Sequence, residues 1–210
     1  TKVEEIRALF DIERVRAEFE RKFGRPAGEE DVQGRYAEFQ RVLFASLEDY
    51  TDPIPGVVET ISALRAQGIR IGSTTGYTDS MMHIVAPKAA RLGYAPDFWI
   101  SPDGVGGRGR PDPYMIFENL KALEVPSVKN AVKVGDTVSD IREGVNAGVW
   151  SVGVIEGSSV LGLSQTEYEA LTPEVRRDAC RRAEETFRAA GAHFVLNDLS
   201  QLPELIRMIG

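Results

Sequence analysis

The sequence of 210 residues predicts an α/β fold, in which helices cover both faces of a parallel sheet that is joined to a small helical domain. Residues 2–50 contain no convincing strand, and their apolar residues recur at helical spacing. From residue 56 onward, short apolar runs alternate with amphipathic segments of helical length, which is the pattern of parallel strands joined by crossover helices. The two patterns meet at the Pro-Ile-Pro-Gly segment 53–56. We therefore place a helical cap domain at residues 1–52 and a Rossmann-like core at residues 53–210.

The cap domain is expected to be a small antiparallel helical module. One apolar stripe runs through residues 3–19 and a second through residues 36–47, and the segment 24–28, which contains glycine and proline, separates them. The remaining faces are rich in Arg and Glu, as is typical of a solvated helix surface.

The core is expected to contain five strands, each connected to the next by at least one helix. A first helix passes through Val57 and stops at Gly68, where glycine interrupts the apolar stripe. The segments that follow keep the same alternation. The expected strands are residues 69–75, 97–100, 131–134, 150–154 and 193–196, and the further helices are residues 78–92, 112–124, 138–147, 173–190 and 199–208.

Composition narrows the classes of function. The 25 Lys and Arg against 32 Asp and Glu give a formal net charge of −7, which argues against a nucleic-acid partner. No apolar run approaches the roughly 18 residues that span a bilayer, so no membrane partner is expected. The single cysteine, Cys180, cannot form an internal disulfide, which favours a reducing cytoplasm. Because the sequence opens within a helical pattern and without Met, we expect it to be part of a longer chain.

Three predicted strand ends carry polar groups, and ligands of open parallel sheets bind beyond the carboxyl ends of the strands. The first is the Ser-Thr-Thr-Gly segment 73–76, whose hydroxyls and backbone N–H groups suit a phosphate oxygen. Ser and Thr are also ordinary helix caps, so this signal is weak by itself. The second is the glycine-rich segment 106–113, where Arg110 precedes Pro111. Its guanidinium is suited to neutralising a phosphoryl group, or it is a solvated arginine in a surface turn.

The third strand end is the strongest signal. An apolar strand ends at Gly135 and is followed directly by Asp136, and Asp140 lies one helical turn later on the same side. Two carboxylates at this spacing, beside hydroxyls, are hard oxygen ligands suited to Mg²⁺ held by few protein groups and several waters. The alternative is that they complement the dipole of the helix that begins there.

These motifs resemble a known superfamily. Thr75-Gly76, Arg110-Pro111 and the Asp136…Asp140 pair look like the second, third and fourth motifs of haloacid-dehalogenase-like proteins. The sequence around these motifs resembles the phosphonoacetaldehyde hydrolase family within that superfamily, and the resemblance covers essentially the whole chain. The strings that carry it are residues 71–78 (IGSTTGYT), 133–140 (KVGDTVSD) and 153–159 (GVIEGSS).

The resemblance implies hydrolysis of the carbon–phosphorus bond of phosphonoacetaldehyde, giving acetaldehyde and phosphate with the help of Mg²⁺. In that family a lysine of the cap domain forms a Schiff base with the aldehyde, and a core aspartate accepts the phosphoryl group. The resemblance also implies a homodimer, although core packing within one chain explains the apolar cap stripes equally well. The implied site residues are Lys2 for the Schiff base, Thr75, Gly76 and Arg110 for the phosphoryl group, Tyr77 as a candidate pocket residue, and Asp136 and Asp140 for Mg²⁺.

The sequence departs from the family pattern in two respects. Three residues after Lys2 this sequence has Glu5, whereas we associate that position with a histidine in the family. A carboxylate can shuttle protons, but it also tends to keep Lys2 protonated. The family's Asp-x-Ala-Gly-Thr-like string, which carries the nucleophile on a first strand, does not occur here, and Asp11 lies in a helical pattern. We expect that strand to belong between the strands that end at Thr75 and Asp136, whose edges would otherwise stay unpaired. Because the nucleophile is not among them, these 210 residues should not catalyse the reaction alone.

Two other functions stay open at this point. Another phosphatase or phosphomutase of the superfamily would share the core but would have no use for a neutral Lys2. A catalytically dead module would keep affinity for Mg²⁺ and phosphate. The sequence upstream of residue 1 would distinguish these hypotheses. An Asp followed by Ala-Gly-Thr there supports the hydrolase, and another residue in place of that Asp favours the dead module.

Overall fold

The computed structural model describes residues 2–210, apart from the side chain of Lys2. It forms two compact units, one ending at Tyr50 and the other beginning at Thr51. The N-terminal unit is helical and the C-terminal unit contains all the strands of the described residues, so the predicted α/β class is confirmed. Among the described residues, no helix combines the length and the apolar composition that crossing a membrane requires.

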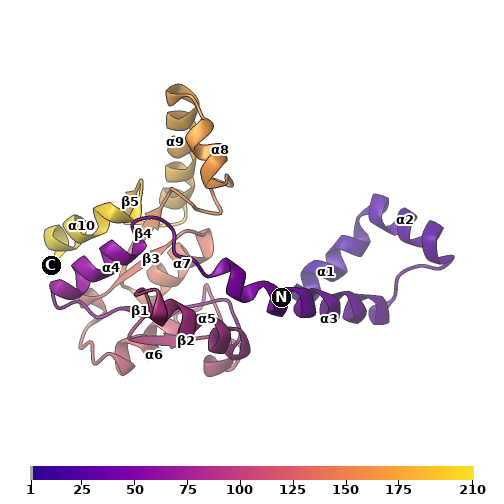
Figure 1. Ribbon diagram of the computed structural model, residues 1–210, viewed down its shortest axis with the longest axis horizontal. Helices are drawn as coiled ribbons and strands as arrows, with labels where there is room; N and C mark the ends of the chain where they lie inside the picture. The colour runs from indigo at the N-terminus through magenta and orange to yellow at the C-terminus, as the bar shows by residue number, and fades with distance from the viewer. Residues whose placement is uncertain (1) are drawn as a thin grey trace. The chain divides into compact units, whose positions relative to one another are not determined.

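The N-terminal unit consists of α1 (Lys2–Asp11), α2 (Glu13–Phe23), α3 (Glu29–Ser46) and the short 3₁₀ helix η1 (Leu47–Tyr50). Helices α1 and α3 lie side by side (Figure 1), and Arg7 of α1 pairs with Glu29 of α3 at 2.9 Å. Phe19 of α2 is buried against Phe10, with ring centroids 5.3 Å apart. The apolar stripe in residues 3–19 is divided between two helices, because the helix breaks at Ile12, which has an extended ψ of 121°.

The C-terminal unit alternates strands with helices, as predicted. Helix α8 is not among the expected helices. It is a six-residue polar helix that begins at a serine cap, and it has no apolar stripe from which hydrophobic periodicity could predict it. The elements in order are α4 (Val57–Ala66), β1 (Gly72–Thr74), α5 (Asp79–Arg91), β2 (Phe98–Ile100), η2 (Pro102–Val105), α6 (Tyr114–Ala122), η3 (Val128–Asn130), β3 (Val132–Gly135), α7 (Val138–Ala147), β4 (Trp150–Val154), α8 (Gln165–Ala170), α9 (Pro173–Ala189), β5 (Phe194–Leu196), η4 (Leu199–Gln201) and α10 (Leu202–Ile209).

All strand pairs are parallel, but the strands form two sheets, β1–β2 and β3–β4–β5. Strand β1 is shorter than the predicted 69–75, because the N–H groups before it bond elsewhere. The N–H of Ile69 donates to Leu64 O at 3.1 Å, and that of Ile71 donates to the Asp97 carboxylate at 2.7 Å. Only three residues are left for the ladder with β2.

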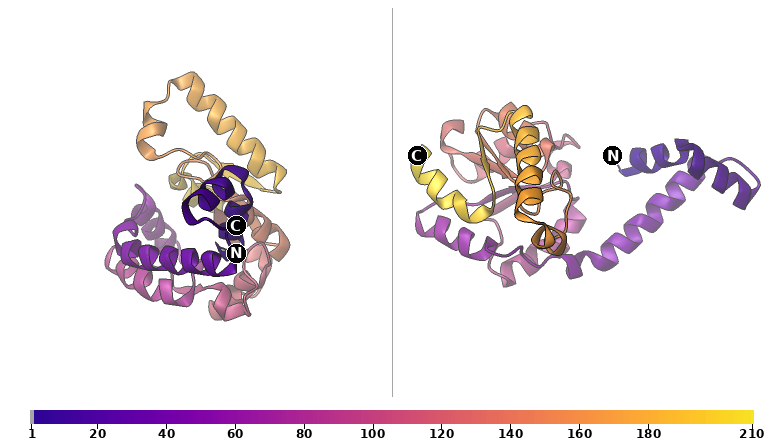
Figure 2. Two further views of the ribbon diagram at one scale, coloured as in Figure 1. Left: turned by 90° about the vertical axis from the view of Figure 1, so that its right-hand side faces the viewer. Right: turned by 90° about the horizontal axis from the view of Figure 1, so that it is seen from above.

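Helices cover both faces of the larger sheet. On one face, Leu64 of α4 and Leu202 and Leu205 of α10 pack with Val152 of β4 in a buried cluster. On the other face, Ile141 of α7 packs with Phe187 of α9. Figures 1 and 2 show α4 and α10 on the side of the strands opposite to α7 and α9. The chain thus builds a three-layer α/β core, whose strand ends carry the polar groups described below.

A groove separates the two sheets. Within residues 2–210, β1 pairs only with β2 and β3 pairs only with β4, so each has one unpaired edge. The groove of about 470 Å³ has mostly apolar walls, which come from both strands and from α4, α6 and α10. Its lining includes Leu64, Ile71, Ile116, Val132, Val134 and Leu202.

The packing of α9 on β4 makes a testable prediction at Gly153. A Cβ added at Gly153 would lie 2.8 Å from ring atom Cδ2 of Phe187, which is fully buried and cannot move aside. We expect Gly153→Ala to lower the free energy of unfolding by about 1–3 kcal/mol in urea titrations.

Gly34→Ala is the control, because Gly34 lies in the exposed middle of α3 with open space around it. It should raise helix stability by up to ~1 kcal/mol. A Gly153→Ala protein as stable as the wild type would contradict the close packing of Phe187 on β4.

Candidate active site

The turn after β1 forms the first part of the candidate site. Thr74 ends the strand, and Thr78 caps helix α5 through its hydroxyl, which accepts from the N–H of Met81. Between them, Thr75 Oγ1 accepts a hydrogen bond of 3.0 Å from the N–H of Tyr77, which closes a tight turn. A hydroxyl has one donor and two acceptor positions, so Thr75 can still donate to an oxygen of a bound anion.

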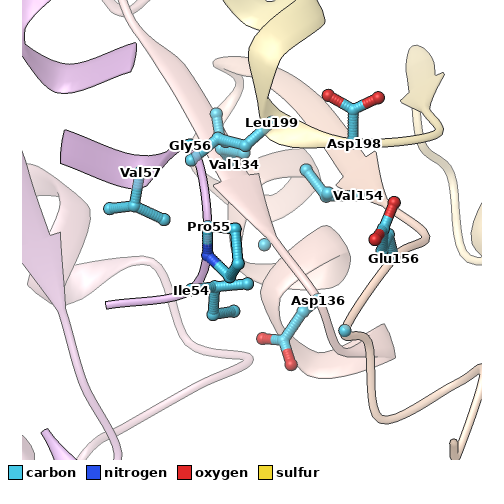
Figure 3. Close-up of a pocket in the computed structure, with 12 residues that line it drawn as sticks. Ile54, Pro55, Gly56, Val57, Val134, Asp136, Val154, Glu156, Asp198 and Leu199 are labelled. Atoms are coloured by element: carbon cyan, nitrogen blue, oxygen red, sulfur yellow. The ribbon is translucent and has the colours of Figure 1, made fainter. Parts of the chain in front are cut away.

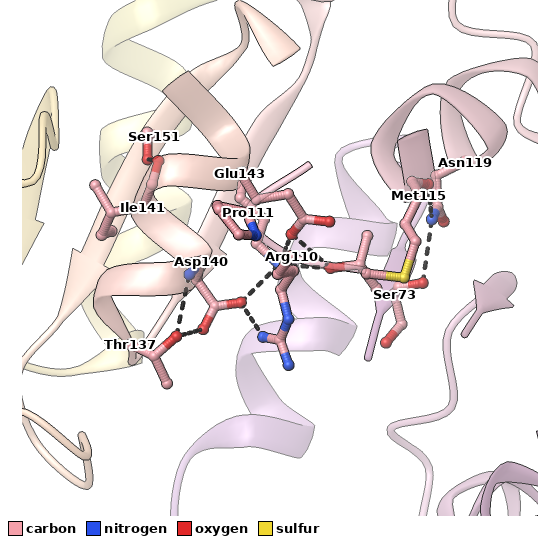
Figure 4. A network of polar contacts seen from close by, with 12 residues as sticks. Ser73, Arg110, Pro111, Met115, Asn119, Thr137, Asp140, Ile141, Glu143 and Ser151 are labelled. Atoms are coloured by element: carbon pink, nitrogen blue, oxygen red, sulfur yellow. Dashed lines mark hydrogen bonds and ion pairs between the residues drawn. The ribbon is translucent and has the colours of Figure 1, made fainter. Parts of the chain in front are cut away.

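Arg110 forms the second part, on the loop between β2 and α6. Its guanidinium donates to Asp140 (Figure 4). The side chain is 23% exposed. A Cβ added at Gly76 would lie 3.2 Å from Arg110 Nη2, so the backbone of the turn after β1 passes close to this cation. Glycine therefore permits the close approach of a backbone N–H and a guanidinium, which is a suitable pair for a phosphoryl oxygen.

Asp140 is the centre of the third part, in the first turn of α7. Thr137 caps this helix: its Oγ1 accepts from the N–H of Asp140 at 3.0 Å and donates to Asp140 Oδ2 at 2.6 Å. Oδ1 of Asp140 accepts from Lys133 Nζ at 2.9 Å and from Arg110 (Figure 4). The residue is only 2% exposed, so two cations and a hydroxyl compensate a buried carboxylate.

The environment of Asp140 changes its acidity. Burial raises the pKa of this carboxyl, but the charges of Lys133 and Arg110 and the hydrogen bonds from Thr137 and Lys133 outweigh burial. Its pKa is therefore lowered from the ordinary value, and the carboxylate stays ionised through the neutral range.

Asp136 lies beside a separate cavity at the ends of β3 and β4. This cavity of about 520 Å³ has apolar walls from the segment 54–57 and carries the carboxylates of Asp136, Glu156 and Asp198 (Figure 3). Asp136 is exposed, and its backbone carbonyl accepts from Ser159 Oγ at 3.1 Å.

The donor set fits Mg²⁺. No cluster of three or more His, Cys, Asp or Glu residues suited to a metal occurs in the part of the chain that the structure describes. Exposed Asp136 and buried Asp140 do supply two carboxylates four residues apart in the sequence, and Mg²⁺ is commonly held by one or two carboxylates, with water and substrate oxygens completing its shell.

Two charged residues of the site were missed from the sequence. Lys133 of β3 forms an ion pair with Glu143 Oε2 at 2.9 Å and donates to Thr74 Oγ1 at 2.7 Å, and Glu143 is fully buried. A signal was present: Lys133 interrupts the apolar run 131–134, and Glu143 lies one helical turn after Asp140 on the same face of α7. An ionisable residue inside an apolar strand indicates a buried partner.

The structure places the predicted residues as follows. Gly76, Arg110 and Asp140 come together, and Thr75 adjoins Gly76. Tyr77 is 39% exposed at the end of the same turn. Asp136 faces the neighbouring cavity. The backbone of Lys2 begins α1, but its side chain lies outside the described residues.

Comparison with known proteins identifies the family of the chain. A family model described as haloacid dehalogenase-like hydrolase matches residues 2–148. The chain belongs to the haloacid dehalogenase-like hydrolases, a class of enzymes. A hydrolase of that name from Deinococcus radiodurans, solved with phosphate and sodium, shares the fold at a TM-score of 0.57 and 21% identity over 95% of this chain and 76% of its own.

The more similar relatives define a narrower family. Phosphonoacetaldehyde hydrolase from Lysinibacillus sphaericus is 48% identical over 208 residues, which are 99% of this chain and 77% of the relative. A crystal structure of a phosphonoacetaldehyde hydrolase-like protein from Oleispira antarctica matches with a TM-score of 0.86 and 32% identity, covering 99% of this chain and 75% of that one. The chain is a member of the phosphonoacetaldehyde hydrolase family.

A bifunctional relative is longer. The phosphonoacetaldehyde hydrolase/aminoethylphosphonate transaminase of Clostridioides difficile is 48% identical over 205 residues. The match covers 98% of this chain and 32% of that protein, so the chain spans about a third of its length.

The lowered pKa of Asp140 predicts how stability depends on pH. The folded-state pKa lies below the unfolded value of about 3.9, so the stabilisation by this carboxylate is present above that value and is lost as pH falls through the folded-state pKa. Arg110→Met removes one of the charges that lower the pKa. We expect the midpoint of Asp140 in carboxyl carbon NMR titrations to rise, and the acid-induced loss of stability to begin at higher pH.

Arg108→Met is the matched control, because exposed Arg108 pairs with Asp112 at 3.1 Å, whereas the charges that lower the pKa of Asp140 are those of Lys133 and Arg110. It should leave the Asp140 midpoint unchanged. Equal midpoints in the wild type and Arg110→Met would contradict the proposed electrostatic cause.

Proposed function

We propose that this protein hydrolyses the carbon–phosphorus bond of phosphonoacetaldehyde, giving acetaldehyde and phosphate. The observation that carries this proposal is the juxtaposition of Gly76, Arg110 and Asp140 at the strand ends, in a chain 48% identical to a relative named for this activity. A small phosphonate is thus the proposed partner. We further propose a cytoplasmic homodimer.

The phosphoryl group would be held by the turn after β1 and by the loop after β2. Thr75 donates its hydroxyl hydrogen, Gly76 its backbone N–H and Arg110 its guanidinium to the phosphoryl oxygens. Phosphoryl transfer depends mainly on positioning and on neutralising charge, and these three groups supply both. Arg110 is already near the backbone of Gly76, which supports a shared ligand.

Asp136 and Asp140 are the proposed residues for Mg²⁺, directly or through water. When bound there, the ion supplies additional neutralisation of phosphoryl charge. Asp140 is fixed by Thr137, Lys133 and Arg110, whereas exposed Asp136 presents its carboxylate at the cavity. One buried, oriented carboxylate and one exposed carboxylate suit an ion that keeps part of its water shell.

Lys2 is the proposed Schiff-base residue. Its neutral amine attacks the aldehyde carbon, and water leaves as the iminium forms. When the phosphoryl group moves to a carboxylate oxygen, the electron pair of the carbon–phosphorus bond passes to the iminium and gives an enamine. Protonation of the enamine and hydrolysis of the resulting imine release acetaldehyde and regenerate the amine, and a further water hydrolyses the acyl phosphate to give phosphate and the free carboxylate. Glu5, three residues after Lys2 in the sequence, is the residue proposed to exchange protons with this amine.

The carboxylate that accepts the phosphoryl group is proposed to lie on an extended strand in the groove between β1 and β3. Both edges facing the groove lack a strand partner within residues 2–210, and the walls are mostly apolar. Asn119 supports an occupant, because its Oδ1 is buried without a hydrogen-bond partner among the described residues. A parallel strand there would end beside Arg110 and Asp140, where phosphoryl transfer is proposed.

The test uses the full-length protein with phosphonoacetaldehyde and Mg²⁺. Acetaldehyde and phosphate should form in equal amounts, and borohydride added with the substrate should leave a reduced adduct on Lys2 that mass spectrometry locates. Lys2→Arg keeps the charge, but a guanidinium stays protonated and forms no imine. We expect it to abolish carbon–phosphorus cleavage without loss of folding or of Mg²⁺ binding.

Lys22→Arg is the matched control, because Lys22 lies in the same unit over the ring of Phe23. It should retain full activity. Activity retained in Lys2→Arg, with no adduct on Lys2, would remove the Schiff-base mechanism and leave an ordinary phosphatase. Phosphate binding without any turnover would instead favour a catalytically dead module.

A further inference from the structure

The two halves of the proposed site lie on different sheets. Thr75 follows β1, whereas Asp140 follows β3, and within residues 2–210 no backbone ladder joins these strands. Neighbouring strands of one sheet are held about 4.8 Å apart by their hydrogen bonds. Across the groove that constraint is absent, so side chains have to set the spacing between the phosphate-binding turn and the carboxylate of α7.

Lys133 makes this connection. Its ammonium lies 2.7 Å from Thr74 Oγ1, 2.9 Å from Asp140 Oδ1 and 2.9 Å from Glu143 Oε2. The ammonium thus has one hydrogen bond and two ion pairs within the chain, which compensate its charge. Thr74 in turn donates its hydroxyl hydrogen to Glu143 Oε2 at 2.8 Å, so two hydrogen bonds and one ion pair link Lys133, Thr74 and Glu143 in a triangle.

Burial makes this arrangement stiff. The side chain of Lys133 is 11% exposed, that of Asp140 is 3% exposed and that of Glu143 is not exposed at all. Charged hydrogen bonds away from water are stronger than exposed ones, and breaking one leaves a buried charge without compensation. The ammonium therefore holds a fixed position between β1 and α7.

We propose that Lys133 is a positioning residue, which holds the turn at Thr75 and the Asp140 carboxylate at the spacing that a bound phosphoryl group requires. This inference rests on the proposed function. Lys133 acts through Thr74, the residue directly before Thr75, and through Asp140. Because Thr74 and two buried carboxylates already surround its ammonium, the proposal gives Lys133 no direct contact with the phosphoryl group.

The test measures the affinity of the full-length protein for inorganic phosphate, with MgCl₂ present, by isothermal titration calorimetry. Lys133→Met and Thr74→Val each remove the hydrogen bond between β3 and β1, and each should weaken phosphate binding by about tenfold or more. If Lys133 acts through Thr74, the double variant should bind little more weakly than Lys133→Met. If Lys133 attracts phosphate directly, the two losses should instead add, which would overturn the proposal.

A further variant separates positioning from folding. Lys133→Met leaves the Glu143 carboxylate buried without its cation, so we combine it with Glu143→Gln, which removes the uncompensated charge. This double variant should recover much of the lost thermal stability but should still bind phosphate about tenfold more weakly. Recovery of affinity together with stability would reduce Lys133 to a structural role and overturn the proposal.

Lys121→Met is the control, because Lys121 is 78% exposed and pairs with Glu118 on the surface of α6. It should bind phosphate like the wild type. Wild-type protein that binds no phosphate would refute the proposed function together with this inference. Wild-type protein that binds phosphate, with Lys133→Met binding equally well, would refute the positioning role alone.

Discussion

The candidate site depends on one constraint: the negative charge of the buried Asp140 carboxylate must be balanced by charged or hydrogen-bonding partners. A carboxylate that is 2% exposed is stable only with charged or hydrogen-bonding partners, and here Arg110, Lys133 and Thr137 provide them. These partners come from the loop after β2, from β3 and from the cap of α7. Satisfying one charge therefore joins the loop after β2 to the segment 133–140, and through Thr74 the network reaches β1 as well.

The division of the strands into two sheets gives this network a structural role. In a continuous sheet, backbone hydrogen bonds would align the ends of β1 and β3, whereas here a groove with mostly apolar walls lies between them. An extended segment with apolar side chains on both faces would satisfy the unpaired edges and cover the groove, as strands of parallel sheets do. The same segment would bring its carboxyl end to the point where Arg110 and Asp140 meet.

Much of the architecture could be predicted from hydrophobic periodicity. The alternation after residue 56 indicates parallel strands with covering helices, and apolar runs such as 150–154 coincide with observed strands. The short strand β1 could not be predicted, because its length depends on where the N–H groups of Ile69 and Ile71 bond. Helix α8 depends on the local cap at Ser164 and carries no apolar stripe.

The site was predictable in part for similar reasons. Motifs at strand ends identify Arg110 and Asp140, because topology brings such ends to one edge of a sheet. The contact between Lys133 and Glu143 is revealed only by the tertiary structure, although a lysine within an apolar strand indicates that it has a buried partner. The proposed role of Lys2 in the N-terminal unit stays a prediction.

A crystal structure of the full-length protein with Mg²⁺ and inorganic phosphate tests the central claim most directly. We expect phosphate oxygens within hydrogen-bond distance of Thr75 Oγ1, the N–H of Gly76 and the guanidinium of Arg110, with Mg²⁺ beside Asp136. Phosphate bound at another place, or Mg²⁺ bound away from both Asp136 and Asp140, would contradict the account.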